Sequence, residues 1–162
     1  MPRKSPAPAR TGLALPAGAV PADLPASLEP ELATLVDAPV GGEWIYEIKF
    51  DGYRMLVRVG GPHDVRIVTR RGNDWTHRFG ALHRALVDAK LPPGWYDGEI
   101  VLLDEAGKPN FNGLQNAIEG GDNDAIVYYL FDVPFCAGHD LRRVPVQERR
   151  ALLQSLLKDA RR

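Results

Sequence analysis

Short runs of β-branched and aromatic residues, separated by turn-forming residues, dominate the chain beyond residue 43 and restrict it to a fold built from short strands. Strands are predicted over 44–50, 54–59, 65–69, 99–104 and 125–135. Apolar residues at helical spacing predict helices over 29–37, 79–89, 111–118 and 145–157. Hairpin-linked strands with helices between them indicate an α+β fold with a mainly antiparallel sheet and flanking helices.

The strongest turn signal is Asp51-Gly52, which separates the first two predicted strands. Asp-Gly between two apolar runs is typical of a two-residue hairpin. We therefore expect residues 44–50 to pair with residues 54–59. Two further turns are predicted over 71–74 and 105–108.

Composition excludes several classes of protein. The 162 residues carry a net charge of -1, and 44% are hydrophobic and 25% charged, which is ordinary for a globular domain. No stretch reaches the roughly 18 uninterrupted apolar residues that a membrane span needs, so no membrane partner is expected. The single cysteine, Cys136, excludes an internal disulfide and a cysteine-rich zinc site. We expect it to be a small buried apolar residue.

Proline is concentrated at the N-terminus, where seven of the 14 prolines lie within residues 1–30. Proline lacks a backbone N–H and is excluded from helix interiors and central strands. Residues 1–27 are therefore expected to form a Pro/Ala-rich linker or a poorly ordered N-terminus, with the folded domain over 28–162. A secretory signal is not expected, because prolines interrupt the apolar stretch that it would need.

The near-neutral total charge conceals blocks of opposite sign. Residues 66–84 hold five arginines against one aspartate, and residues 140–162 hold seven Lys/Arg against three acids. Residues 97–124 hold seven acids and one lysine. Local charge, rather than the total, decides what a surface attracts. The basic blocks are therefore either solvated faces or phosphate-binding surfaces.

Lys49 lies in a predicted strand, two residues before the predicted turn. Strand alternation places Glu47, Lys49 and Asp51 on one face, with Ile48 and Phe50 on the other. An amine held on a rigid element is a nucleophile if burial or nearby cations lower its pKa. From these residues alone, a solvated hairpin face with paired charges remains the alternative.

Lys49, Asp51, Gly52 and Arg54 form the pattern Lys-x-Asp-Gly-x-Arg, which resembles the first motif of the covalent nucleotidyltransferases: DNA ligases, RNA ligases and mRNA capping enzymes. Three further stretches resemble later motifs of this family in the same order, at 69–72, 97–101 and 128–132. Over about residues 28–157 the chain is most similar to the ATP-dependent ligase domain of bacterial ligase D, a non-homologous end-joining enzyme. The resemblance implies a partial nucleotidyltransferase (ATP-grasp-like ligase) domain.

The resemblance also implies a role for individual residues. Lys49 would attack the α-phosphate of ATP, release pyrophosphate and carry AMP as a phosphoramidate. Glu47 would accept a hydrogen bond from the adenine amino group, Phe131 would stack on adenine, and Arg54 would contact the ribose. Glu99 would lie near the ribose and the metal, Mg²⁺ or Mn²⁺. The arginines of the basic block, Arg70 and Arg71, would hold DNA phosphates, as sequence-independent binding requires.

The chain also departs from the family pattern. The family continues into a Glu-Gly motif, a Lys-x-Lys motif and an oligonucleotide-binding fold, and residues 133–162 contain none of these. Without the later lysines, fewer cations surround Lys49 and the leaving pyrophosphate. We therefore expect residues 1–162 by themselves to ligate poorly or not at all. Marginal stability, or association with the missing C-terminal ligase segment, is also expected.

Three functions remain open from the sequence. The first is a fragment of an ATP-dependent DNA ligase, acting on nicked or broken duplex DNA with end-joining proteins as partners, in the bacterial cytoplasm at the nucleoid. The second is an RNA ligase or capping-type nucleotidyltransferase, which the motifs do not separate from the first. The third is a non-catalytic remnant that binds nucleic acid or a partner through the basic block.

Overall fold

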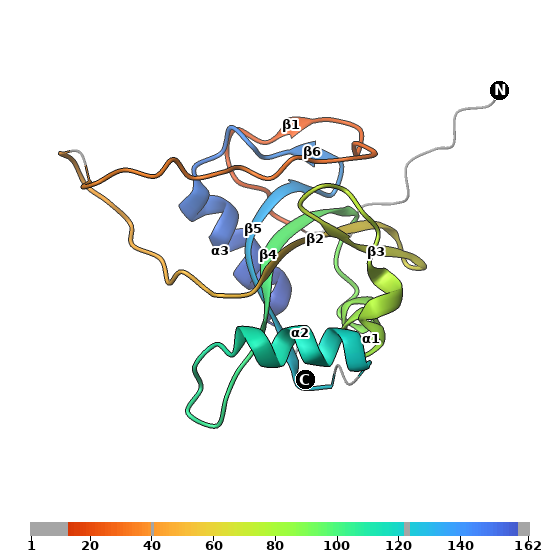
Figure 1. The fold of residues 1–162 in the computed structure, drawn as a ribbon. Helices are drawn as coiled ribbons and strands as arrows, with labels where there is room; N and C mark the ends of the chain where they lie inside the picture. The colour runs from red at the N-terminus through yellow and green to blue at the C-terminus, as the bar shows by residue number, and fades with distance from the viewer. Residues whose placement is uncertain (1–12, 40, 122–123, 159–162) are drawn as a thin grey trace.

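The computed structural model describes residues 13–39, 41–121 and 124–158. Six antiparallel strands form one sheet in the order β1-β6-β5-β4-β2-β3, with the helices packed around it (Figure 1). The strands are β1 (Val20–Pro21), β2 (Tyr53–Gly61), β3 (Asp64–Thr69), β4 (Gly94–Leu102), β5 (Ile126–Cys136) and β6 (His139–Asp140). The helices are η1 (Thr76–Arg78), α1 (Gly80–Asp88), α2 (Phe111–Gly120) and α3 (Val146–Leu157). The predicted α+β class is confirmed.

Two apolar clusters lie on opposite faces of the sheet. Alternate residues of β2, such as Met55 and Val57, belong to the larger cluster, to which all three α-helices contribute. Leu56, between them, belongs to a smaller cluster with Trp95 and Phe135. The period-2 alternation of β2 thus gives each face of the sheet its own core.

Residues 13–28 pack against the sheet, so the structure differs here from the linker predicted over 1–27. β1 pairs with β6, and Leu24 and Leu28 cover the smaller cluster. The Trp95 indole N–H donates to the Pro25 carbonyl at 3.0 Å. Leucines between the prolines supply the contacts, and prolines are tolerated in an edge strand such as β1. Residues 1–12 lie outside the described residues.

The predicted strand over 44–50 and its hairpin turn are wrong. β2 pairs with β3 on one side and with β4 on the other, so no edge of β2 is free for residues 44–50. This segment lies outside every described strand. Gly52 serves a different purpose: a Cβ there would overlap the Ile100 carbonyl oxygen, so glycine permits the chain to enter β2 close against β4.

The predicted helix over 29–37 is also wrong, because these residues are irregular and exposed, with Leu35 at 97% exposure. A nine-residue helix is marginal in water unless its apolar face packs on something. Leu32, Leu35 and Val36 all remain exposed, so nothing stabilises a helix here.

The other predicted elements are confirmed within two residues at their ends, except that β4 begins at Gly94, five residues before the predicted start of that strand. Cys136 is buried as predicted, and burial raises the pKa of its thiol to about 11. Among the described residues, none of the helices combines the length and apolarity that crossing a membrane requires.

Candidate functional site

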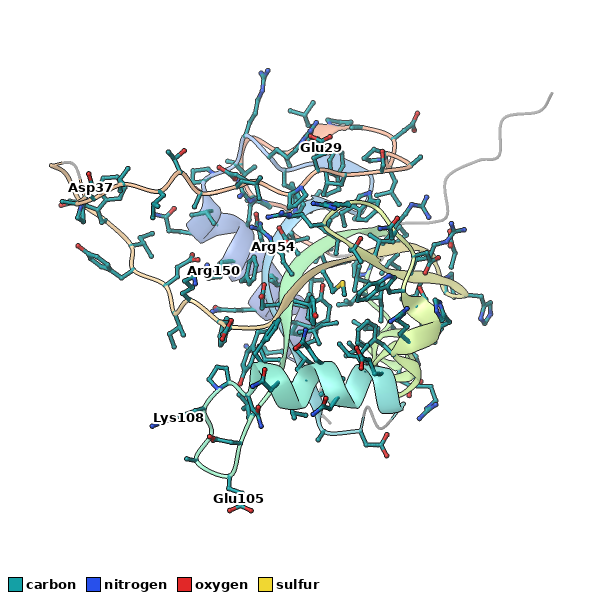
Figure 2. All side chains as sticks on the ribbon, viewed as in Figure 1. Glu29, Asp37, Arg54, Glu105, Lys108 and Arg150 are labelled. Atoms are coloured by element: carbon teal, nitrogen blue, oxygen red, sulfur yellow. The ribbon has the colours of Figure 1, made fainter. Side chains whose placement is uncertain are left out.

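A cavity of about 640 Å³ opens beside the entrance to β2, and the side chains around it come from five separate stretches of sequence. Five of the predicted site residues line it: Glu47, Lys49, Arg54, Glu99 and Phe131. In Figure 2, Arg54 and Arg150, which both line this cavity, lie near the middle of the molecule, whereas Lys108 and Glu105 lie on a projecting turn. The structure therefore brings together all the residues predicted for nucleotide chemistry.

The sheet determines where the polar residues of the cavity lie. Arg54 and Glu99 are direct register partners in β2 and β4. Arg54 precedes Leu56 by two residues, so it lies on the same face as the smaller apolar cluster. The cavity therefore lies on the same face of the sheet as the smaller apolar cluster. The N-terminal segment covers part of this face.

Lys49 reaches the cavity from an irregular segment rather than from a strand. Its neighbour Phe50 stacks on Tyr129 of β5, with ring centroids 4.3 Å apart and planes at 9°. Stacked aromatic pairs contribute about 0.5–1.5 kcal/mol beyond area burial. This contact fixes the backbone next to Lys49 against the sheet, while the Lys49 side chain itself stays exposed.

Arg54 is held by a two-bond fork to Asp97. Its Nε donates to Asp97 Oδ1 at 3.1 Å and its Nη2 donates to Oδ2 at 2.7 Å. Asp97 is only 3% exposed, and this burial raises its pKa, an effect that the Arg54 guanidinium partly offsets. The hydrogen bond to Asp97 raises the pKa of Arg54 in turn. The fork presents a fixed cation to the cavity.

Glu99 is the only carboxylate of the predicted site that lies within a strand of the sheet. Burial raises its pKa, while Arg54 and the Gly52 backbone N–H act in the opposite direction. No group of three His, Cys, Asp or Glu residues that could hold a metal occurs in the described part of the chain. Mg²⁺ commonly takes only one or two protein carboxylates and completes its shell with water and substrate phosphates. A single Glu99 carboxylate at the cavity fits that requirement.

Phe131 and Asp132 both line the cavity, although strand alternation predicts opposite faces for them. The reason is a β-bulge: Asp97 pairs with Asp132 and Gly98 pairs with Leu130, which leaves Phe131 as an extra residue. Bulges re-aim side chains and are frequent beside active sites. The Arg54 guanidinium lies over the Phe131 ring, 5.4 Å from its centroid.

Two arginines of α3 were missed by the sequence predictions. Arg149 forms a fork with Asp132, with Nε donating to Oδ1 at 2.7 Å and Nη2 to Oδ2 at 2.8 Å. The available signal was helical spacing, because Arg149 shares a face with Leu152, Leu153 and Leu156. An arginine on an apolar face requires a buried partner.

Arg150, the next residue of α3, forms an ion pair with Glu47. The carboxylate predicted to face adenine is therefore engaged by an arginine in this structure. Glu31 also reaches α3, with a carboxylate oxygen 3.6 Å from Arg149 Nη2. The N-terminal end of α3 thus forms one wall of the cavity.

Arg70 and Arg71 do not line this cavity and instead lie on the exposed turn after β3. β3 runs antiparallel to β2, so Thr69 pairs with Met55, and the turn lies at the same end of the sheet as Arg54. Other arginines of the basic block are engaged, since Arg66 pairs with Asp64 at 3.0 Å and Arg78 lies over Trp75. Arg70 and Arg71 have no ion-pair partner among the described residues.

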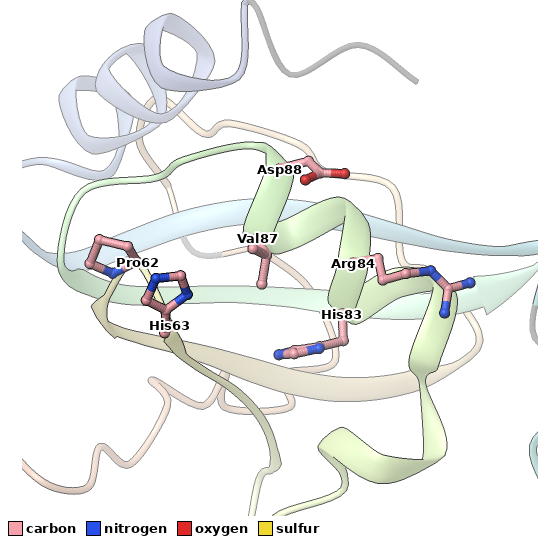
Figure 3. A pocket seen from close by; sticks show the side chains of 6 residues that line it. All are labelled: Pro62, His63, His83, Arg84, Val87 and Asp88. Carbon is pink, nitrogen blue, oxygen red and sulfur yellow. The ribbon is translucent and has the colours of Figure 1, made fainter.

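A second, smaller cavity of about 380 Å³ lies where the β2–β3 hairpin meets α1 (Figure 3). It is lined by Pro62, His63, His83, Arg84, Val87 and Asp88. His83 Nε2 is 3.1 Å from the Val65 carbonyl oxygen, which ties α1 to β3. None of the predicted nucleotide-site residues lies here.

Comparison with known proteins identifies the family. Residues 26–162 match the family model of the ATP dependent DNA ligase domain. The chain is 51% identical over 134 residues to the multifunctional non-homologous end joining protein LigD of Pseudomonas aeruginosa, covering 83% of this chain and 16% of that protein. It is 34% identical over 132 residues to the LigD of Mycobacterium tuberculosis, covering 80% of this chain and 17% of that protein.

Solved structures agree with these relatives. The ligase domain of M. tuberculosis LigD superposes with a TM-score of 0.58 at 34% identity, covering 69% of this chain and 36% of that one. A mycobacterial DNA ligase D complexed with ATP and MES gives a TM-score of 0.57 at the same identity and coverage. The chain thus spans about one sixth of the curated relatives and about a third of these structures. By its sequence motifs, its fold and these relatives, the chain belongs to the ATP-dependent DNA ligase family.

Proposed function

We propose that the chain forms the N-terminal part of the adenylation domain of a DNA ligase that seals breaks in end-joining repair, with Lys49 as the residue that accepts AMP. The observation that carries this proposal is that Glu47, Lys49, Arg54, Glu99 and Phe131 line one cavity. They come from four segments of the chain, so their convergence is a property of the fold. We assign residues 28–162 to this domain, and residues 13–27 cover its sheet.

In the proposed first step, the neutral Lys49 Nζ attacks the α-phosphorus of ATP in line with the bond to the β-phosphate. The P–N bond forms as that P–O bond breaks, and the electron pair leaves with pyrophosphate. Once the P–N bond has formed, the nitrogen carries a positive charge and loses one proton to solvent, which leaves a phosphoramidate. Transfer of this kind depends on positioning and charge stabilisation. Arg54, fixed by Asp97, supplies one cation at the cavity.

The base would lie at the Phe131 end of the cavity. Aromatic stacking on a base contributes about 1–3 kcal/mol without reading base edges. Glu47 would supply the acceptor for the adenine amino group through Oε2, because its ion pair with Arg150 engages Oε1.

Glu99 would hold the divalent metal, with water and ATP phosphates as the other ligands. When bound, Mg²⁺ neutralises charge on the transferring phosphate. On the turn after β3, Arg70 and Arg71, which have no ion-pair partner among the described residues, would contact DNA phosphates without reading sequence.

The proposal is tested with ATP labelled at the α-phosphate, added with Mg²⁺ to the whole chain and to two matched variants. Lys49→Met removes the proposed nucleophile, and Lys108→Met removes an exposed turn lysine. We expect ATP to bind all three proteins, with slow labelling confined to Lys49, because the later cationic motifs of the family are absent from residues 133–162. Label that persists in Lys49→Met, or a chain that neither binds ATP nor takes label, would contradict the proposal.

A further inference from the structure

Two partly buried ion pairs lie next to each other across β4 and β5, beside the larger cavity. Asp97 and Asp132 are register partners, so two carboxylates lie directly opposite each other. Each is neutralised from a different element, Asp97 by Arg54 of β2 and Asp132 by Arg149 of α3. Like charges opposite each other destabilise a sheet, so each aspartate depends on its arginine.

Arg149 and Asp132, together with the backbone groups that they bind, form a hydrogen-bonded clamp. Arg149 is 5% exposed, and besides its two bonds to Asp132 its Nη1 donates to the Val144 carbonyl at 2.7 Å. Asp132 Oδ1 also accepts from the Val133 backbone N–H at 2.7 Å. The clamp therefore joins the start of α3, the loop before it and the backbone of β5 directly after Phe131.

This clamp acts at the β-bulge. Phe131 is the residue of the bulge that has no partner in β4. Pairing with β4 therefore does not fix the direction of its side chain. Its direction depends on Asp132, which is held by Arg149 on one side and lies opposite Asp97 on the other. Resting on the proposed function, we infer that Arg149 is a positioning residue for base binding, which acts through Asp132 to hold Phe131 at the cavity.

The inference is tested by a double-mutant cycle in ATP affinity, measured by calorimetry on the whole chain at a temperature where every variant is folded. The four proteins are wild type, Phe131→Ala, Arg149→Lys and the double variant. Lysine keeps the charge but loses the planar fork. We expect Arg149→Lys to weaken ATP binding about 3- to 10-fold in wild type, and by less than about 2-fold when Phe131 is already alanine. If Arg149 only stabilised the fold, Arg149→Lys would weaken ATP binding equally in wild type and in Phe131→Ala.

Arg142→Lys is the matched control, because Arg142 also pairs with an aspartate, Asp140, and lies over a phenylalanine, Phe135, outside the cavity. It should leave ATP affinity unchanged. Asp132→Asn is the second variant, should Arg149→Lys not fold, and the same non-additivity with Phe131→Ala is expected. Equal effects in the two backgrounds, or unchanged ATP affinity in Arg149→Lys, would overturn the inference. Failure of both variants to fold would also overturn it, by making the pair a requirement of the fold.

The failure of the proposed function has a different signature. If wild type does not bind ATP, or Phe131→Ala binds it as tightly as wild type, the cavity is not the proposed base site. If Phe131→Ala weakens binding but the cycle is additive, the proposed function stands and the role of Arg149 is wrong.

Discussion

At the scale of single residues, the larger cavity carries charge that the fold shields from water. Asp97 lies beneath Arg54 and is almost fully buried, while Glu99 is half-buried two residues further along β4. Burial raises the pKa of both carboxyls. Charged residues at functional sites often lower the stability of a protein. The effect of the Glu99 charge on the free energy of unfolding can be measured by substitution.

Glu99→Gln is expected to stabilise the chain slightly at pH 7. The raised pKa of Glu99 means that the folded state binds this proton more tightly than the unfolded chain does. Ionised Glu99 therefore lowers the free energy of unfolding above its folded pKa, and this loss disappears as the pH falls towards the unfolded pKa of about 4.3. Because the side chain is partly solvated, we expect a gain below about 1 kcal/mol.

Urea denaturation of wild type and Glu99→Gln at several pH values between 4 and 8 checks this expectation. The advantage of the variant should shrink steadily as the pH is lowered. A variant that is less stable than wild type at pH 7, with a difference independent of pH, would contradict it.

Gly98→Ala should destabilise the chain by about 1–3 kcal/mol. A Cβ at Gly98 would overlap the Tyr129 carbonyl oxygen and lie 2.6 Å from the Tyr128 ring, beside the bulge. Gly120 in α2 is the matched control, since a Cβ there meets nothing within 4 Å and alanine favours a helix. Denaturation midpoints should therefore fall for Gly98→Ala and not for Gly120→Ala. Equal midpoints would show that β4 and β5 separate easily at this position.

At the scale of elements, residues 45–50 bring the predicted nucleophile to the cavity without belonging to a strand. Tyr46 and Ile48 are 80% and 78% exposed, and Phe50 anchors the end of the segment on Tyr129. The segment has strand-forming residues but no free strand edge beside it in β2.

We expect the backbone amides of residues 45–50 to exchange with deuterium far faster than those of β2 and β4. Amides outside a ladder exchange through small local openings, whereas those of central strands require larger ones. Hydrogen exchange followed by peptide mass spectrometry checks this. Protection of 45–50 equal to that of β2 would mean that the segment pairs with another strand in solution.

Local sequence predicted the elements that depend on local contacts. β3 and α2 follow from alternation and helical spacing in their own residues, and each packs on the larger cluster as expected. The failures concern contacts between distant residues: β2 pairs with β4 instead of with 44–50, and the apolar residues of 29–37 find nothing to pack on. Whether an apolar run becomes a strand depends on whether a neighbouring strand has a free edge for it, and the residues of the run do not determine that.

The candidate site shows the same division. The resemblance to the nucleotidyltransferase motifs predicted which residues meet at the cavity, including Lys49 and Phe131. It did not predict the bulge that turns Phe131 and Asp132 to the same cavity, because a bulge depends on the register between two strands. Nor did it predict Arg149, which acts from a helix that follows the motifs in the sequence.

At the scale of the whole molecule, the two faces of the sheet have different roles. The helices and the larger apolar cluster stabilise one face, and the opposite face carries the smaller cluster and the charged cavity. Arg70 and Arg71 extend from the same end of the sheet. Nucleotide and DNA would thus meet at one end of the molecule, as the proposed function requires.

The location of bound ATP tests this account most directly. Amide chemical shifts of the isotope-labelled chain, followed during titration with ATP, would map the site onto the two cavities. We predict saturable shifts at Arg54, Glu99 and Phe131, with little change at His83 and Arg84 in the second cavity. Shifts confined to His83 and Arg84, or no saturable shifts at all, would contradict the assignment of the larger cavity as the nucleotide site.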